Sequence, residues 1–116
     1  MNISKFIPLF FLFFLFPLFT CSENDSYIPE IYVNFSVNLN DPEFFALNAS
    51  GNYVIVNGGL RGIVIYRKSF DEFLALDLTC TFDPKEDCAT LKPNTVKNFI
   101  FEDLCCGSQF SMLLDG

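Results

Sequence analysis

The sequence contains no histidine and no tryptophan, and its 7 basic residues are outnumbered by 14 acidic ones. Histidine is the side chain that most often acts as a general base near neutral pH, and it is a common metal ligand. Without it, only Asp, Glu, Lys and Cys remain as candidates for proton transfer. The net charge of −7 also disfavours binding to nucleic acid, because the phosphate backbone is itself anionic.

Candidate catalytic groups are correspondingly few. Ser108 lies in Gly107-Ser108-Gln109, which does not match the G-x-S-x-G nucleophile elbow, and no base can be assigned to it. Adjacent acids such as Glu102 and Asp103 would face opposite sides of a strand. The sequence therefore predicts a protein that is not an enzyme and has no catalytic residue.

One long apolar run is present, and it lies at the N-terminus. Residues 6–20 are almost wholly apolar, follow Lys5, and are interrupted by Pro8 and Pro17. The run is shorter than the roughly 20 residues that a membrane-spanning helix needs. This pattern predicts a secretory signal peptide over residues 1–20, with an uncleaved anchor helix as the alternative. The sequence Leu18-Phe19-Thr20-Cys21 resembles a bacterial lipoprotein signal, in which the cysteine is lipidated.

Cys21 is accordingly the predicted lipidation site, and residues 21–30 the predicted tether to the membrane. The remaining chain carries six basic and 14 acidic residues, hence a charge of −8. Glu23 and Asp25 resemble the export signals of surface-exposed lipoproteins of Bacteroidetes, but a solvated tether is the preferred explanation of two charges alone. The predicted location is the cell envelope of a Gram-negative bacterium, with a lipid anchor in the outer membrane.

From residue 31 the sequence changes to strand-like patterns. Apolar and polar residues alternate strictly over residues 31–39, which predicts a strand with one buried face. Asn40-Asp41-Pro42 ends it, because proline cannot donate to a sheet. Residues 44–47 fit either a short strand or a helical turn.

The remaining strand candidates are short and separated by turn residues: 53–56, 63–66, 73–76, 98–104 and a last one within 112–116. Asn57-Gly58 between the first two predicts a hairpin, because both residues tolerate positive φ. The first three form a predicted meander that leads into Cys80. A chain of this length holds one small domain, so the sequence predicts an all-β, antiparallel domain over residues 31–116.

Four cysteines remain once Cys21 is assigned to lipidation: Cys80, Cys88, Cys105 and Cys106. An even number in an oxidising compartment favours disulfides, of which three connectivities are possible. A bond between the neighbours Cys105 and Cys106 would need a strained ring. Each of these two is therefore expected to pair with one of Cys80 and Cys88.

Two cysteine-bearing segments, Cys80-Thr81-Phe82 and Cys105-Cys106-Gly107-Ser108-Gln109-Phe110, resemble the cluster-holding loops of a Rieske iron–sulfur domain. Those loops, C-x-H and C-x-x-H-G-S-x-F, face each other and hold a [2Fe–2S] cluster through two Cys and two His ligands. Gly107, Ser108 and Phe110 match the G-S-x-F tail of the second loop. The stretch Gly-Gly-Leu-Arg-Gly-Ile at 58–63 is similar to one in the Rieske-like lipoproteins of Bacteroidetes.

The resemblance assigns the ligand positions to Cys80, Phe82, Asp103 and Cys106, where the family has Cys, His, Cys and His. Because the chain has no imidazole, the expectation is no metal and no cofactor. The alternative is a [2Fe–2S] cluster kept through unusual ligands that include Cys80 and Cys106. An all-thiolate cluster would use all four cysteines. Zinc is disfavoured by the spacing, which lacks the paired cysteines of structural zinc sites.

The resemblance further implies two disulfides in place of the cluster. Cys88–Cys105 would match a bridge that braces the loops in many family members, and Cys80–Cys106 would join the loop tips. Closing a loop of about 25 residues stabilises a fold by roughly 3–4 kcal/mol in the chain-entropy model. The family normally continues beyond the equivalent of Asp115-Gly116, so the domain is expected to lack its last strands.

These expectations define the predicted function. The chain would be a membrane-anchored envelope lipoprotein whose degenerate, cluster-less Rieske-like domain has a structural or interaction role. Its partners would be the membrane, through the lipid, and an envelope protein, but not nucleic acid. The alternative is an electron-transfer protein with a metal centre, and a redox-active Cys80–Cys106 disulfide is a third hypothesis.

Overall fold

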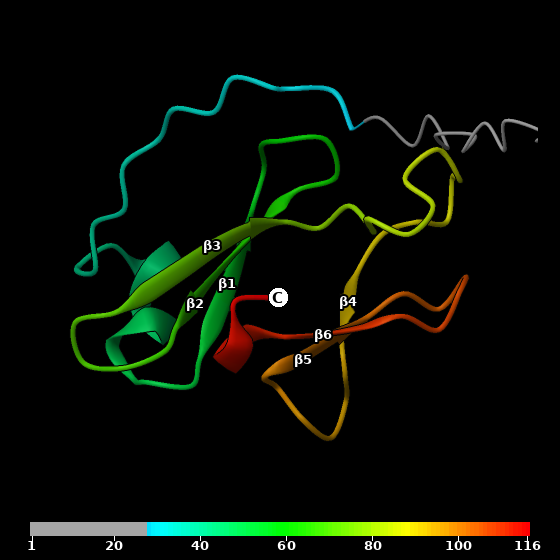
Figure 1. The fold of residues 1–116 in the computed structure, drawn as a ribbon. Coiled ribbons are helices and arrows are strands. Elements are labelled where there is room, and N and C mark those ends of the chain that lie inside the picture. Colours follow the sequence, from blue (N-terminus) through cyan, green and yellow to red (C-terminus); the bar gives the residue numbers. More distant parts are fainter. Residues whose placement is uncertain (1–27) are drawn as a thin grey trace, which may run out of the picture.

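The computed structural model describes residues 28–116, in which two small antiparallel sheets enclose a common core (Figure 1). The first sheet has the order β1-β2-β3, with strands β1 Tyr53–Val56, β2 Ile63–Arg67 and β3 Phe73–Asp77. The second has the order β4-β5-β6, with strands β4 Lys92–Pro93, β5 Ile100–Glu102 and β6 Gln109–Ser111. The 3-10 helices are η3 Pro42–Asn48 and η4 Met112–Leu114. The prediction of a small all-β antiparallel domain is confirmed.

The first sheet is the predicted meander. Tyr53 pairs with Tyr66 at one end of the β1–β2 hairpin and Val56 with Ile63 at the other. The predicted Asn-Gly turn is longer than two residues, because the chain forms a loop over 57–62 before β2 begins. Gly59 is required in this loop: its φ is +62°, and a Cβ atom there would lie 2.0 Å from the Asp77 carboxylate. That carboxylate accepts a hydrogen bond from the Leu60 N–H at 2.6 Å.

The second sheet was only partly predictable. The strand expected over 98–104 forms as the shorter β5, whose central residue Phe101 pairs with Pro93 on one side and Phe110 on the other. Strands β4 and β6 were not predicted. Pro93 is tolerated because β4 is an edge strand, where a missing N–H leaves no partner unsatisfied.

Between the sheets lies a core formed by the inner face of β1–β3 and the second sheet. Its fully buried members include Val64 and Tyr66 of β2, Phe101 of β5 and Met112 of η4. The rings of Tyr53 and Phe101 meet edge to face, with their centroids 5.1 Å apart. Such aromatic contacts stabilise a core beyond their buried area, so this pair helps to hold the two sheets together.

The outer face of the first sheet is covered by η3. Phe44 and Leu47 of this helix pack on Ile63 and Ile65 of β2. Residues 44–47, for which the sequence allowed a strand or a helical turn, are therefore helical. The Arg67 guanidinium extends from the end of β2 and donates to the Leu47 carbonyl at 2.7 Å, which fixes η3 to the sheet.

The strand predicted over residues 31–39 is absent, which is a correction. These residues, here termed the strap, are extended but pair with no strand, and residues 31–37 make no hydrogen bond to the part of the chain that is described. In Figure 1 the strap is the cyan segment that arches beside β3. The apolar–polar alternation over residues 31–39 is explained by the orientation of the strap: its odd-numbered, apolar side chains face β2 and β3. Apolar alternation reports the orientation of side chains, not the pairing of the backbone.

The strand predicted within residues 112–116 is also absent. Met112 is completely buried, and its N–H donates to the Phe99 carbonyl at 2.8 Å, so the chain turns inward. The short helix η4 follows and ends at Asp115, whose backbone is left-handed with φ +67°. Among residues 28–116, no helix is long and apolar enough to cross a membrane.

Candidate functional site

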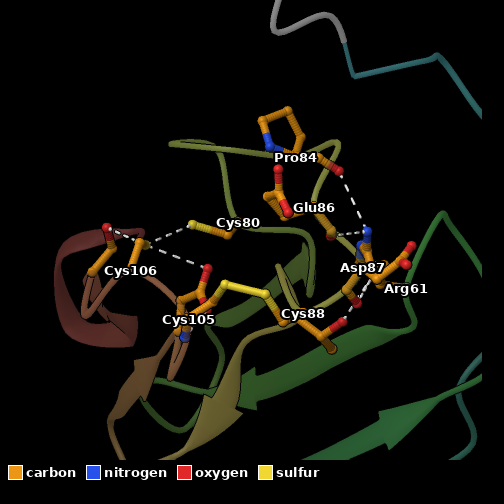
Figure 2. Close-up of a disulfide and its surroundings, with 11 residues drawn as sticks. Arg61, Cys80, Pro84, Glu86, Asp87, Cys88, Cys105 and Cys106 are labelled. Carbon is orange, nitrogen blue, oxygen red and sulfur yellow. Dashed lines mark hydrogen bonds between the residues drawn. A yellow bond between two sulfur atoms is a disulfide. The ribbon is translucent and has the colours of Figure 1, made fainter.

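The two cysteine-bearing loops meet at one end of the second sheet. A disulfide joins Cys88 of the first loop to Cys105 of the second, with their Cα atoms 5.8 Å apart (Figure 2). This is one of the two bridges that the Rieske resemblance implied, and the structure confirms it. In the chain-entropy model, a closed loop of this size stabilises the fold by about 3 kcal/mol.

The other implied bridge is not formed, which is a correction. Cys80 and Cys106 are free thiols whose Sγ atoms lie 3.7 Å apart. The structure therefore places Cys80 beside Cys106, as the resemblance implied, but their sulfur atoms are too far apart for a disulfide bond. Cys80 is fully buried and Cys106 is exposed, so one thiol is open to solvent and the other lies behind it.

Asp103 completes a three-residue group with these thiols, and all three donor atoms lie within 4.8 Å of one another. Its carboxylate is 1% exposed, although a buried charge is costly without partners. Oδ1 accepts the Cys105 N–H at 2.7 Å, and Oδ2 lies 3.4 Å from the Cys106 Sγ. Hydrogen bonding from Cys80 and from the Cys105 N–H lowers the pKa of Asp103, which keeps it ionised.

The pKa of the Cys80 thiol is shifted in the opposite direction, to a higher value. Burial raises its pKa, and the hydrogen bond to Asp103 adds to this effect because a carboxylate stabilises the protonated thiol. Without a bound cation, Cys80 is therefore a neutral thiol rather than a reactive thiolate at neutral pH.

Residues of the predicted loop motif build the turn that carries Cys106. The Asp103 N–H donates to the Ser108 carbonyl at 2.9 Å, and the Gly107 N–H donates to the Asp103 carbonyl at 2.8 Å. Gly107 has φ +78°, a conformation that favours glycine. Ser108 Oγ lies 3.1 Å from Cys106 Sγ, while Phe110 belongs to β6 and packs against the core. The motif thus shapes the loop and places a hydroxyl beside the exposed thiol.

Arg61 holds the first cysteine loop, a role that was not predicted from the sequence. Its guanidinium donates to the carbonyls of Pro84, Glu86 and Asp87, at 3.4, 2.6 and 2.9 Å (Figure 2). Three carbonyls around one cation fix a loop that has no regular structure of its own. The only signal in the sequence is the position of Arg61 within the Gly-rich loop at 58–62.

The donor set does not fit a [2Fe–2S] cluster. Such a cluster needs four protein ligands, and Rieske centres use two imidazoles. Cys88 and Cys105 are bonded to each other, so two thiols and one carboxylate remain near the loop tips. Phe82, at the position that the resemblance assigned to the first histidine, is 74% exposed. The residues present are therefore one donor short and lack imidazole.

A second candidate site is the groove between the strap and the first sheet. It consists of two adjoining hollows of about 370 Å³ each, which share Phe35 and Ala75. One hollow is lined only by apolar side chains, namely Phe35, Val37, Leu39, Ile65, Phe73 and Ala75. Among the described residues, no strand pairs with β3 on the side away from β2, so the backbone groups on that edge are available to bind another strand.

Cys21 and the predicted signal peptide lie outside the described residues. Comparison of the chain with protein-family models, curated proteins and solved structures gives no match.

Proposed function

We propose that the chain is a membrane-anchored lipoprotein of the bacterial cell envelope whose β domain binds an extended, apolar segment of an envelope protein. The domain has no catalytic role in this proposal. The observation that carries the proposal is the groove, because an apolar hollow lies beside an unpaired sheet edge. An extended peptide could occupy both features together, as in other cases of strand addition.

The strap supports the proposal because its apolar side chains are only partly buried against the sheet. Ile31, Val33 and Phe35 are 42, 40 and 43% exposed even though they face the sheet. Apolar side chains that face a sheet without filling the space between are typical of an interaction surface. The backbone of residues 31–37 is also unpaired, so a bound strand would find hydrogen-bond partners on two sides.

The lipid anchor and the Rieske-like origin enter as parts of the same proposal. Cys21 would tether the domain, and the meeting of the two cysteine loops supports a relationship to a cluster-binding ancestor. Electron transfer through a [2Fe–2S] cluster is not favoured, because the donor set does not fit one.

The anchor is tested by expressing the chain in a Gram-negative bacterial host and labelling with radioactive palmitate. The wild type should be labelled and recovered with membranes, and Cys21→Ala should be neither. A labelled Cys21→Ala protein would contradict the assignment.

The groove is tested by placing a photo-crosslinking amino acid at Ala75, which is exposed in the groove. We expect one discrete adduct in the envelope, mapping to an apolar segment of the partner, and loss of it when Phe35 is changed to Asp. The exposed Ala49, at the end of η3 and outside the groove, is the matched control position. Equal adducts from both positions, or none from Ala75, would contradict the proposal.

A further inference from the structure

The geometry at the loop tips points to a binding site for one divalent transition-metal ion: we propose that Cys80, Cys106 and Asp103 bind Zn²⁺ in a tetrahedral site with one open position. Two sulfurs and one carboxylate oxygen, which come from two different loops, converge on a single point. The inference does not depend on the groove or on the lipid anchor.

The distances agree with those of a tetrahedral ion. Zn–S bonds of about 2.3 Å and Zn–O bonds of about 2.1 Å place two sulfurs about 3.8 Å apart, and a sulfur and an oxygen about 3.6 Å apart. The two Sγ atoms lie 3.7 Å apart, and Cys106 Sγ lies 3.4 Å from Asp103 Oδ2. The separation of the two sulfurs is too long for a disulfide. Together, the two distances match two edges of the coordination tetrahedron.

The carboxylate is oriented for this role. Its Oδ1 is held by the Cys105 N–H, which leaves Oδ2 directed towards the sulfurs. Outer contacts of this kind are typical of metal ligands, because they fix the orientation of the donor. Cys105 is itself fixed by its disulfide to Cys88, so the structural bridge positions the third ligand (Figure 2).

The burial of the three groups also fits a cation. Cys80 and Asp103 are buried, and Cys106 is exposed, so the ion would enter past Cys106. On binding, both S–H bonds lose their protons to solvent, and two thiolates and one carboxylate then surround a 2+ ion. A water molecule would complete the coordination of the ion at the open fourth position. Zn²⁺ accepts both sulfur and oxygen ligands, whereas Mg²⁺ and Ca²⁺ take oxygen alone.

The test is a titration of the full chain, purified anaerobically in detergent without added reductant, with Co²⁺ followed by Zn²⁺. We expect one Co²⁺ per chain, with thiolate-to-metal charge-transfer absorption and the intense visible bands of a tetrahedral ion, both abolished by Zn²⁺. Cys106→Ser should remove the charge-transfer bands. It should fold normally, since Cys106 is exposed.

Asp103→Asn tests the oxygen ligand, with Asp87→Asn as the matched control because Asp87 is an exposed carboxylate of the other cysteine loop. We expect Asp103→Asn to weaken Zn²⁺ binding by at least the roughly 10- to 100-fold that changes around metal ligands cause, and Asp87→Asn to leave it unchanged. The shift of the melting temperature by Zn²⁺ reports binding independently of absorption, and should be lost in Cys106→Ser and reduced in Asp103→Asn.

Three outcomes would overturn the site. The first is a Cys80–Cys106 disulfide in the isolated chain, seen as the absence of alkylation at both residues. The second is Co²⁺ binding without thiolate absorption, and the third is unchanged affinity in Asp103→Asn. The groove variant Phe35→Asp should bind Zn²⁺ normally, so failure of the metal site and failure of the groove can be told apart.

Discussion

The two faces of the first sheet are built from the same three strands but are covered very differently. On the inner face, Val64 and Tyr66 are 1 and 2% exposed, because the second sheet packs on them. On the outer face, η3 buries Ile63 and Ile65, but its cover stops before β3, where Phe73 is 43% exposed. A domain of this size has enough apolar residues to bury one face of the sheet fully but not the other. The apolar face that stays exposed is where a partner is expected to bind.

The largest predicted difference in stability is between two variants, one at a phenylalanine that packs on the inner face of the first sheet and one at a phenylalanine that lies over its outer face. Phe101→Ala should lower the free energy of unfolding by about 3–5 kcal/mol, because it opens a cavity between the sheets. Phe35→Ala on the strap should change it by less than about 1 kcal/mol, because the side chain is already partly hydrated. Urea unfolding of the two variants measures both values. Equal losses would show that the strap belongs to the core.

The next largest effect is expected for the disulfide that joins the two cysteine loops. The double variant Cys88→Ala/Cys105→Ala should lose about 3 kcal/mol of unfolding free energy, because the unfolded chain is no longer constrained. Urea unfolding of this variant and the wild type gives the value. The double variant should also bind Zn²⁺ more weakly than the wild type, since the Cys105 N–H is no longer held against Asp103. A variant as stable as the wild type would mean that the loops are held without the bridge.

Arg61 connects the turn between β1 and β2 with the first cysteine loop, and its effect should be smaller. Arg61→Ala leaves the carbonyls of Pro84, Glu86 and Asp87 without their donor, at a cost of about 2 kcal/mol. Proteolysis within the cysteine loop should become faster, which limited digestion with chymotrypsin, at sites such as the exposed Phe82, and mass spectrometry would detect. Lys85→Ala, in the same exposed loop, is the control and should leave the cleavage pattern unchanged.

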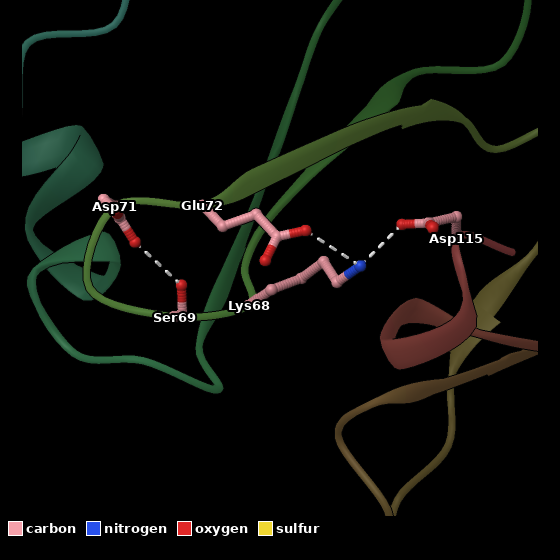
Figure 3. A network of polar contacts seen from close by, with 5 residues as sticks. All are labelled: Lys68, Ser69, Asp71, Glu72 and Asp115. Carbon is pink, nitrogen blue, oxygen red and sulfur yellow. Dashed lines mark hydrogen bonds and ion pairs between the residues drawn. The ribbon is translucent and has the colours of Figure 1, made fainter.

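The smallest expected effect comes from the contacts of Lys68, which join the first sheet to the C-terminal turn (Figure 3). Its ammonium lies 2.7 Å from Asp115 and 3.1 Å from Glu72. Hydrogen bonding to Asp115, and then to Glu72, raises the pKa of Lys68 above its ordinary value of 10.5. The contribution of Lys68 to stability is therefore complete below pH 10.5 and is lost as the pH rises through the raised pKa.

Lys68→Gln should accordingly melt slightly below the wild type at pH 7, and the difference should vanish at strongly alkaline pH. High salt should also reduce it, because the carboxylate partners are exposed. Melting curves at several pH values test this expectation, with Lys85→Gln as the control. A difference that grows with pH would contradict the sign of the linkage.

Features that depend on local sequence were predictable. The meander β1–β3 follows from short β-branched runs separated by turn residues, and Cys88–Cys105 follows from the Rieske resemblance. The strap could not be predicted, because alternation over residues 31–39 is equally compatible with a paired strand and with an extended segment that lies over a sheet. Strands β4 and β6 are too short to leave a periodic pattern.

The candidate sites depend on contacts between distant residues, and this limited their prediction. The Rieske resemblance assigned Asp103 to a ligand position beside Cys80 and Cys106, and the structure brings these three residues together, but the burial of the Asp103 side chain was not predicted. Arg61 looks like an isolated surface cation, and only the approach of the loop at residues 84–87 provides its partners. Burial of a charged residue is decided by tertiary packing, so neither the burial of Asp103 nor the contacts of Arg61 are visible locally.

The central claim is that the strap lies beside β3 without pairing to it, which leaves a groove for another strand. Hydrogen exchange of the backbone amides in the full chain tests this claim most directly. The account predicts slow exchange in β2, and exchange over residues 31–37 that is nearly as fast as in an unfolded peptide. Protection of residues 31–37 equal to that of β3 would contradict it, because the strap would then be a fourth strand and the groove would be closed.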